Sequence, residues 1–430
     1  MASITDLSTR IASNTTKLNT YLTTHNLPPP SLDITAPVNL LPPNTPAEIV
    51  LARQCIIDDT LELRNLVLGP REHIMTTYQA LDMTSPKAIT RFRLAHAFPV
   101  GSETTFGALA AYSGLGETHI RKLIRHAISA HDLFSEPRPG VVAHSAASKL
   151  LAEDEALHAW VEHATHELWN AAYHAPDAME RFPASGEPNE TGFSLANNTG
   201  KSFFGFMSEH PERLRRFAAV MRFVTRRPEL GPELVVDAFP WDSLPRPGGK
   251  VVDVGGSHGL VCIELARRFP GLEFVVQDLD EPVVRDADAR KPSEVADRVS
   301  FMTHDFFTPQ PVRGADVYFL RAVLHNWSDG YAVRILRNLI PGLKRGAKVV
   351  INDVVVPEAG SMSKPVELRA RISDLTQVVL QNAGDREIGD WVSLLEAADS
   401  RFRFKEAKPM PGSTRLWVIV AEWEGVGTTS

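Results

Sequence analysis

The chain has 430 residues, of which 43% are hydrophobic and 23% charged, and its formal net charge at pH 7 is −7. This length allows two or three domains, and the composition is that of an ordinary globular protein. The acidic balance argues against a protein whose main task is to hold nucleic acid, and two distant cysteines, Cys55 and Cys262, exclude a disulfide framework or a cysteine metal cluster.

The beginning of the chain and its hydropathy bear on location. The first residues lack the basic and apolar layout of a signal peptide, and no apolar run has the length of a membrane span. We therefore expect a soluble, cytoplasmic protein.

Residues 1–245 are predicted to be mainly helical, with proline-rich interruptions near the start. Residues 47–69 carry several apolar positions per helical turn, which predicts a helix buried on more than one side. Residues 104–129 form two helical runs around a glycine-containing turn, and residues 133–151 add strand-turn-strand material. This succession predicts a winged helix.

Residues 246–430 alternate short apolar runs with helical ones. The runs begin with KVVDVGG at 250–256 and LEFVVQDLD at 272–280, and they end with RLWVIVAEWE at 415–424. Such alternation is typical of a parallel sheet with crossover helices. The predicted fold class is α/β, with a C-terminal Rossmann-like domain over 246–430 preceded by a mainly helical winged-helix domain over 1–245.

The stretch VVDVGGSHGL, residues 251–260, allows two interpretations. Its Gly-x-Ser-x-Gly pattern fits a hydrolase nucleophile elbow, in which Ser257 attacks a carbonyl and His325 is the base. That elbow requires most of the sheet and an oxyanion loop upstream, and residues 1–250 offer neither. We favour a turn that binds a cofactor.

The residues of this turn indicate which kind of cofactor it can bind. Gly255 and Gly256 end the first strand, but Ser257 and Leu260 replace the later glycines of a dinucleotide pattern, so a pyrophosphate is poorly matched. Asp278 ends the next strand, where a carboxylate accepts hydrogen bonds from ribose hydroxyls. A nucleoside without phosphates fits both features, and S-adenosylmethionine is the obvious candidate.

At this point the sequence resembles a known family, the class I O-methyltransferases of the plant caffeate type and their fungal secondary-metabolism relatives. The matching segments, in family order, are VVDVGGSHG, VVQDLDEPVV, THDFF, FLRAVLHNWSD and VVINDVVVPE. The resemblance covers essentially the whole chain, because the family also has an N-terminal helical winged-helix region that forms a homodimer and closes the pocket. It implies a homodimer here.

The resemblance also implies cofactor contacts. Gly255 and Gly256 match the backbone platform for the methionine part, and Asp278 matches the ribose ligand. Asp305 and Phe306 match the pair that bonds and packs the adenine. Arg321 stands near the cofactor, where the family usually has a lysine.

His325 matches the family's catalytic base, Asp353 its orienting carboxylate, and Asp385 a second one, with Glu387 as the rival assignment. A phenol with a pKa near 10 is mostly protonated at neutral pH, and a histidine with a pKa of about 6.5 can take its proton as the oxygen attacks a methyl group. A carboxylate on the other ring nitrogen stabilises the imidazolium. The chemistry favours a phenolic or enolic hydroxyl on an aromatic or polyketide-type acceptor, although a nitrogen acceptor stays open.

No set of histidine and carboxylate residues has the sequence spacing of metal ligands, and the predicted chemistry needs no metal. Aromatic residues and methionines suit a flat apolar acceptor, although they also build helix cores. For the acceptor wall the sequence offers Trp169, Phe203, Phe204, Met207 and Met221.

Two other functions compete with methyl transfer. Arg121, Lys122 and Arg125 lie on the would-be recognition helix of the winged helix, as in a DNA-binding regulator, but the cluster is small and the chain acidic. The fold could also bind the cofactor for non-methylating chemistry of the pericyclase or decarboxylase type. The presence of His325 and Asp353 favours methyl transfer over both.

Overall fold

The structure is a computed structural model that describes residues 3–225, 230–413 and 415–425. The chain divides into two compact units, which are described separately. The first unit comprises Met1–Trp169, Arg216–Val220 and Ser363–Pro365, and the second comprises Asn170–Arg215, Met221–Met362 and Val366–Ser430. Among the described helices, none combines the length and apolar character that crossing a bilayer requires.

These units divide the chain differently from the predicted boundary at residue 245. The segment around residue 186 is bound to the unit that contains the large sheet: Ser328 Oγ donates to the Gly186 carbonyl at 2.8 Å, and Asn382 Nδ2 donates to the Glu190 carbonyl at 2.8 Å. Residues 170–215, with the helices they form, therefore belong to the unit of the large sheet.

The first unit is helical with one small sheet. Its elements are α1 (Ile4–Thr24), α2 (Ala47–Thr77), α3 (Thr84–Arg91), η1 (Leu94–His96), β1 (Glu103–Thr105), α4 (Phe106–Ser113), α5 (Glu117–His131), β2 (Ser135–Arg138), β3 (Val141–Ala143), α6 (Ala146–Glu153), α7 (Glu155–His163) and the π-helical turn η2 (Ala164–Leu168). The antiparallel sheet has the order β1-β3-β2. Helices α4 and α5 followed by the β2–β3 hairpin form the predicted winged helix, with Leu109, Ile120, Ile124 and Val142 fully buried in its core.

Helix α2 differs from its prediction. Gly69, at φ 66°, and Pro70 interrupt it, so that two helical segments meet at a kink. Within α2 only Ile49, Ala52 and Asp59 are buried, whereas Leu51, Val67 and Met75 are 63%, 67% and 67% exposed. The expectation of burial on more than one side is therefore wrong for the described chain, in which many apolar side chains of α2 remain exposed.

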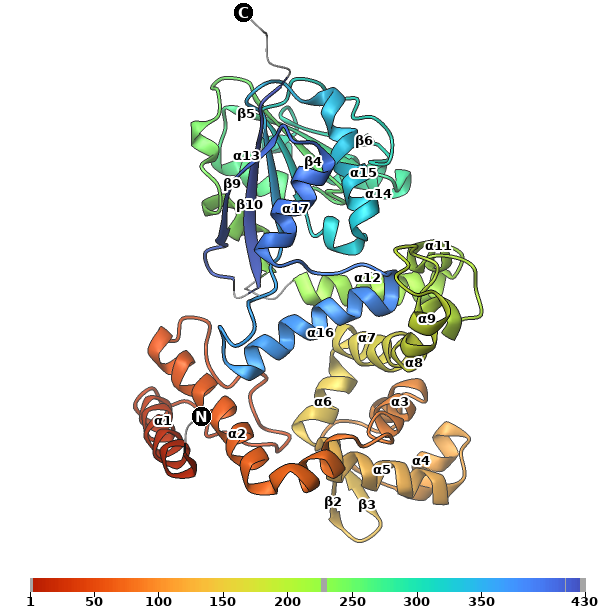
Figure 1. Cartoon of the computed structure of the whole chain (residues 1–430). Helices are drawn as coiled ribbons and strands as arrows, with labels where there is room; N and C mark the ends of the chain where they lie inside the picture. Colours follow the sequence, from red (N-terminus) through yellow and green to blue (C-terminus); the bar gives the residue numbers. More distant parts are fainter. Residues whose placement is uncertain (1–2, 226–229, 414, 426–430) are drawn as a thin grey trace, which may run out of the picture. The chain divides into compact units, whose positions relative to one another are not determined.

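The second unit contains the large sheet (Figure 1). Its strands are β4 (Gly249–Val254), β5 (Leu272–Asp278), β6 (Val299–Thr303), β7 (Val317–Arg321), β8 (Lys348–Val354), β9 (Phe402–Pro409) and β10 (Leu416–Trp423), in the spatial order β6-β5-β4-β7-β8-β10-β9. The first five strands in this order are parallel, and β10 pairs antiparallel with both β8 and β9. This confirms the predicted α/β fold class.

Helices complete the second unit. They are α8 (Trp169–Tyr173), α9 (Ala175–Arg181), α10 (Gly192–Ala196), α11 (Phe203–Ser208), α12 (Pro211–Thr225), η4 (Pro232–Asp237), η5 (Trp241–Ser243), α13 (Leu260–Arg268), α14 (Glu281–Arg290), η6 (Ser293–Val295), η7 (Leu324–Asn326), α15 (Asp329–Leu339), η8 (Ile340–Gly342), α16 (Lys364–Gln381) and α17 (Ile388–Ala398); α12 and α16 also contribute residues to the first unit. Residues of η4, η5 and α13 share one hydrophobic cluster with the sheet, and residues of α15 and α17 share another. The sheet is thus packed on both faces, as parallel sheets require.

Candidate active site

The candidate site lies at the carboxyl ends of β7 and β8. These strands are parallel neighbours, so their ends meet at one edge of the sheet. His325 lies in the short turn η7 after β7, Asp353 is the next-to-last residue of β8, and Asp385 precedes α17. The predicted base and its two predicted carboxylates, more than 25 residues apart in sequence, are therefore brought together.

Both carboxylates contact the same ring nitrogen. His325 Nδ1 lies 3.2 Å from Asp353 Oδ1 and 3.3 Å from Asp385 Oδ1. The side chain of His325 is 16% exposed, whereas those of both aspartates are fully buried. Two buried carboxylates on one imidazole nitrogen hold a proton on that nitrogen and orient the ring.

Burial and neighbouring charges shift the pKa values of His325 and Asp353. Burial alone lowers the pKa of His325, but the two carboxylates outweigh it, so the pKa is raised above its usual value. Burial raises the pKa of Asp353, an effect that the neighbouring His325 opposes. Each group thus stabilises the charged form of the other, which is what a base needs once it has accepted a proton.

Glu387, the rival for the second carboxylate position, has a different role. It is the N-cap of α17 in a reciprocal capping box with Asp390, and its carboxylate lies 3.6 Å from the Arg371 guanidinium. Of the two rivals, Asp385 is the one whose carboxylate contacts His325.

The same three side chains also form a donor set for a cation. One histidine nitrogen and two carboxylate oxygens lie within 4.8 Å of one another, although the residues are far apart in sequence. Sequence spacing could not show this juxtaposition, because it arises only when the strands pair. The distances from Nδ1 to the carboxylates are those of hydrogen bonds, which fits the acid–base interpretation.

The glycine turn after β4 is tightly built. The backbone N–H groups of Gly255 and Gly256 both donate to the Gln277 carbonyl, at 2.8 and 3.0 Å, and that of Ser257 donates to Asp278 Oδ2 at 3.0 Å. Gly255 has φ +79°, and a Cβ there would lie 2.9 Å from Val323 Cγ2. A Cβ on Gly256 would lie 2.4 Å from the buried Asp253 carboxylate, so packing alone already requires this glycine.

This pattern bears on which ligand the turn can bind. Three consecutive N–H groups are used internally, so the turn offers no array of donors to a phosphate. Ser257 adopts φ +50° and its Oγ lies 3.0 Å from Nδ1 of the adjacent His258, while His325 is engaged with its carboxylates. Ser257 and His325 therefore do not form the nucleophile–base pair of a hydrolase elbow, and the internal hydrogen bonds of the turn favour a ligand without phosphates.

The other predicted cofactor residues surround the same sheet edge. Asp278 ends β5 and fixes the turn through Ser257. Asp305 follows β6, where its Oδ1 accepts from the Phe307 N–H at 2.8 Å. The ring of Phe306 would lie 3.9 Å from a Cβ on Gly255, so it is close to the glycine turn.

Arg321 is placed less directly than predicted. Its guanidinium is partly buried and donates to the Leu230 carbonyl at 2.6 Å, and burial lowers its pKa despite the nearby Asp253. Its observed partners are thus protein groups that tie β7 to the segment before η4. A contact with the cofactor stays a prediction.

The predicted acceptor residues are scattered. Phe203 and Met207 are 1% exposed in α11, where Phe203 packs edge-on against Phe193 with centroids 5.0 Å apart. Phe204 and Met221 are 41% and 39% exposed. Trp169 belongs to the first unit, where Lys87 Nζ lies 5.3 Å above its ring. Burial favours a core role for Phe203 and Met207.

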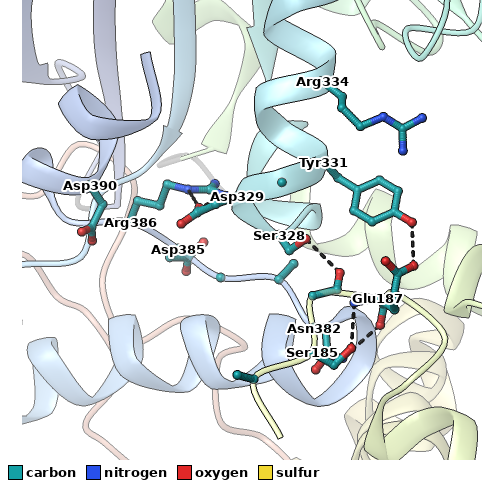
Figure 2. A pocket seen from close by; sticks show the side chains of 15 residues that line it. Ser185, Glu187, Ser328, Asp329, Tyr331, Arg334, Asn382, Asp385, Arg386 and Asp390 are labelled. Atoms are coloured by element: carbon teal, nitrogen blue, oxygen red, sulfur yellow. Dashed lines mark hydrogen bonds and ion pairs between the residues drawn. The ribbon is translucent and has the colours of Figure 1, made fainter. Parts of the chain in front are cut away.

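The sequence did not indicate Arg386 or the pocket that Asp385 and Arg386 help to line. This pocket has a volume of about 720 Å³ and is lined by residues 184–187, 328–331, 334, 382–386 and 390, including Asp385 and Arg386 (Figure 2). Tyr331 donates to Glu187 at 2.7 Å across it. The only sequence signal was the cluster of charges in GDREIGDW.

The large sheet and the histidine–carboxylate group at its edge were compared with known proteins. The family description "O-methyltransferase domain" matches residues 187–401. The chain is 38% identical to O-methyltransferase pyvH of Aspergillus violaceofuscus, over 98% of this chain and 99% of the relative. It is 37% identical to a chlorophenol O-methyltransferase of Trichoderma longibrachiatum, over 97% of this chain and 90% of the relative. The solved structure of LepI C52A with SAH and a substrate analogue has a TM-score of 0.66 and 25% identity, covering 86% of this chain and 94% of that one.

The chain belongs to the O-methyltransferase family. It is an S-adenosylmethionine-dependent O-methyltransferase whose relatives are named O-methyltransferases of fungal secondary metabolism. The predicted enzyme class and cofactor are thereby confirmed.

Proposed function

We propose that the enzyme methylates a phenolic or enolic hydroxyl of a small aromatic or polyketide-type metabolite, with His325 as general base. The observation that carries this proposal is the contact of His325 Nδ1 with two buried carboxylates, at 3.2 and 3.3 Å. Because Nδ1 holds the orienting proton, Nε2 is the nitrogen that accepts the hydroxyl proton. The name of the Trichoderma relative, a chlorophenol O-methyltransferase, supports a phenolic acceptor.

The cofactor and three side chains have different roles in the proposed reaction. S-adenosylmethionine supplies the methyl group. His325 removes the acceptor proton as the oxygen becomes a nucleophile, and Asp353 and Asp385 stabilise the imidazolium that results. Holding the reactants in line provides much of the remaining acceleration.

For the cofactor we propose the six residues that the resemblance indicates: Gly255, Gly256, Asp278, Asp305, Phe306 and Arg321. The absence of free amide donors at residues 255–257 supports a nucleoside without phosphates. Asp278 keeps lone pairs for ribose hydroxyls beyond those that accept from Ser257 and Asp280.

Of the residues proposed to contact the acceptor, Phe204 and Met221 are the strongest candidates, because their side chains are partly exposed. Trp169, Phe203 and Met207 complete the proposed set. Burial makes Phe203 and Met207 the weaker members, since a core side chain cannot reach a ligand without repacking.

We also propose a homodimer that covers exposed apolar side chains of α2. Val50, Leu51, Val67, Ile74 and Met75 are each at least 47% exposed there, and an apolar surface of this kind marks an interface. In this proposal residues 1–245 provide dimerisation and a lid, and residues 246–430 provide catalysis. Sedimentation should give twice the mass of one chain for the native protein, and one chain for a Val67→Asp/Met75→Asp variant.

Cytoplasmic location and the absence of a nucleic-acid partner belong to the same proposal. Cys55 and Cys262 are free, as is usual in a reducing compartment. Arg125 is held by Glu136 through two 2.8 Å hydrogen bonds, so the basic side chains on α5 are partly neutralised.

Incubation of the enzyme with methyl-labelled S-adenosylmethionine and a panel of phenolic acceptors tests the function. A product that carries the label and is heavier by one methyl group is expected. Conversion of an acceptor without incorporation of the label would contradict methyl transfer and favour the non-methylating alternative.

A further inference from the structure

Arg386 is a buried cation whose partners surround the active-site base. Its side chain is 5% exposed. Nη1 donates to the Leu324 carbonyl at 3.0 Å, and Nη2 donates to the Trp327 carbonyl at 2.8 Å. A buried guanidinium must have its donors satisfied, and here two of them are satisfied by backbone oxygens on either side of His325.

The turn that holds His325 needs such support. The 3₁₀-helix η7 has only three residues, Leu324–Asn326, and is closed by long backbone bonds such as that from the Trp327 N–H to the Leu324 carbonyl at 3.2 Å, the carbonyl that Arg386 also binds. Leu324 immediately precedes His325, and Trp327 is two residues beyond it. A planar guanidinium that binds both carbonyls fixes the direction in which the histidine leaves the backbone.

The backbone of Arg386 is joined to the two chain segments that carry the carboxylates. Its carbonyl accepts from the Val356 N–H at 3.0 Å, and it forms a parallel bridge with Val355, two residues after Asp353. Asp385 is its direct neighbour in the chain, and the Asp385 N–H donates to Asp374 Oδ1 at 3.0 Å. One residue thus connects the three segments that carry His325, Asp353 and Asp385.

Two further contacts hold the guanidinium itself. Its centre lies 5.2 Å from the ring centroid of the fully buried Trp391, and Nε donates to Asp329 Oδ1 at 2.9 Å. Figure 2 shows Arg386 extending toward Asp329, with Asp385 beside it. The cation is therefore held in one orientation, with the ring of Trp391 beside it.

We propose that Arg386 is a positioning residue for methyl transfer. It holds the segments of the base and of both carboxylates in place and does not touch acceptor or cofactor. This proposal rests on the proposed role of His325. A misplacement of about 1 Å in a reacting group can lower a rate by roughly 10²-fold. Loss of Arg386 should therefore act on kcat rather than on binding.

The test compares Arg386→Met and Arg386→Lys with the matched control Arg337→Met. Arg337 also donates to two backbone carbonyls, those of Ala398 and Ala397 at 2.9 Å each, but on the far end of α17. For each variant, kcat and the acceptor KM are measured on folded enzyme, and the Kd for S-adenosylmethionine is measured by calorimetry. His325→Ala, measured in parallel, tests the proposed base independently.

We expect Arg386→Met to lower kcat by roughly 10- to 100-fold with KM and Kd changed less than threefold, and Arg337→Met to retain kcat. Arg386→Lys should recover only part of the lost kcat. The ammonium keeps the positive charge, but it cannot bind both carbonyls as a guanidinium does. A kcat for Arg386→Met within twofold of the native value, or equal losses in both methionine variants, would overturn the proposal. If Arg386→Met does not fold, Arg386→Lys decides: a fivefold or larger loss of kcat at unchanged KM supports the proposal, and a smaller loss overturns it.

Discussion

His325 is linked to Asp353 through both its ring and its backbone. Nδ1 lies 3.2 Å from one carboxylate oxygen, and the His325 N–H donates to the other oxygen at 3.2 Å. One fully buried carboxylate thereby fixes the start of the turn and the plane of the imidazole. The orientation of the base is set by the end of the neighbouring strand, β8.

This link predicts the behaviour of His325→Ala. The variant should lose product formation by roughly 10²- to 10⁴-fold, the usual contribution of a general base. Cofactor binding should survive, because the six proposed cofactor residues lie at the ends of β5 and β7 and in the loops after β4 and β6, and His325 is not among them. Mass spectrometry of the product and calorimetry of S-adenosylmethionine binding measure the two effects. Near-normal turnover would refute the role of His325.

The pH dependence of kcat should change in Asp385→Asn. His325 accepts a proton only when neutral, and its carboxylates raise its pKa above 6.5, so activity in the native enzyme rises with pH through that raised pKa. Removing one negative charge lowers the pKa of His325. The acidic limb of the kcat profile should therefore move to lower pH, while the plateau falls. A limb that stays in place would show that Asp385 does not act on His325.

Removal of metal ions should leave activity intact. The donor atoms of His325, Asp353 and Asp385 are close enough to bind a cation, but the Nδ1 distances are those of hydrogen bonds to a protonated nitrogen. We expect turnover to remain within twofold after dialysis against EDTA. A loss that Mg²⁺ or Zn²⁺ restores would replace the acid–base interpretation with a metal-assisted one.

The sequence predicted much of the sheet and the residues at its edge, because parallel strands are dense apolar runs and their ends carry the motif residues. It missed β9, where Arg403 and Lys405 alternate with Phe402 and Phe404 and the strand resembles an exposed surface. It also missed Arg386, since donation to backbone carbonyls depends on folding and leaves no pattern in the chain. The burial of α2 was overestimated because apolar spacing alone does not show whether another part of the chain covers those side chains.

Asp253 in β4 gives a prediction about stability. It is 3% exposed, and burial raises its pKa to about 6 from an ordinary 3.8. Above pH 6 the carboxyl is ionised in both the folded and the unfolded chain, so the folded state bears the full cost of the buried charge. As the pH falls from 6 toward 4, the folded state gains the proton first and the cost disappears. The shift of about two pKa units corresponds to roughly 3 kcal/mol as an upper bound.

Asp253→Asn should therefore raise the free energy of unfolding by about 1–3 kcal/mol at pH 8, with a gain that shrinks toward pH 4.5. Arg321 keeps its bond to the Leu230 carbonyl in this variant, so the substitution leaves no unpartnered guanidinium. Asp399 is the control of opposite sign: hydrogen bonds from Arg401 lower its pKa to about 2, so Asp399→Asn should destabilise the protein at pH 8. Urea unfolding at both pH values measures these differences. An equal effect of Asp253→Asn at pH 8 and pH 4.5 would contradict the prediction, because it would show that ionisation of this carboxyl carries no cost in the folded state.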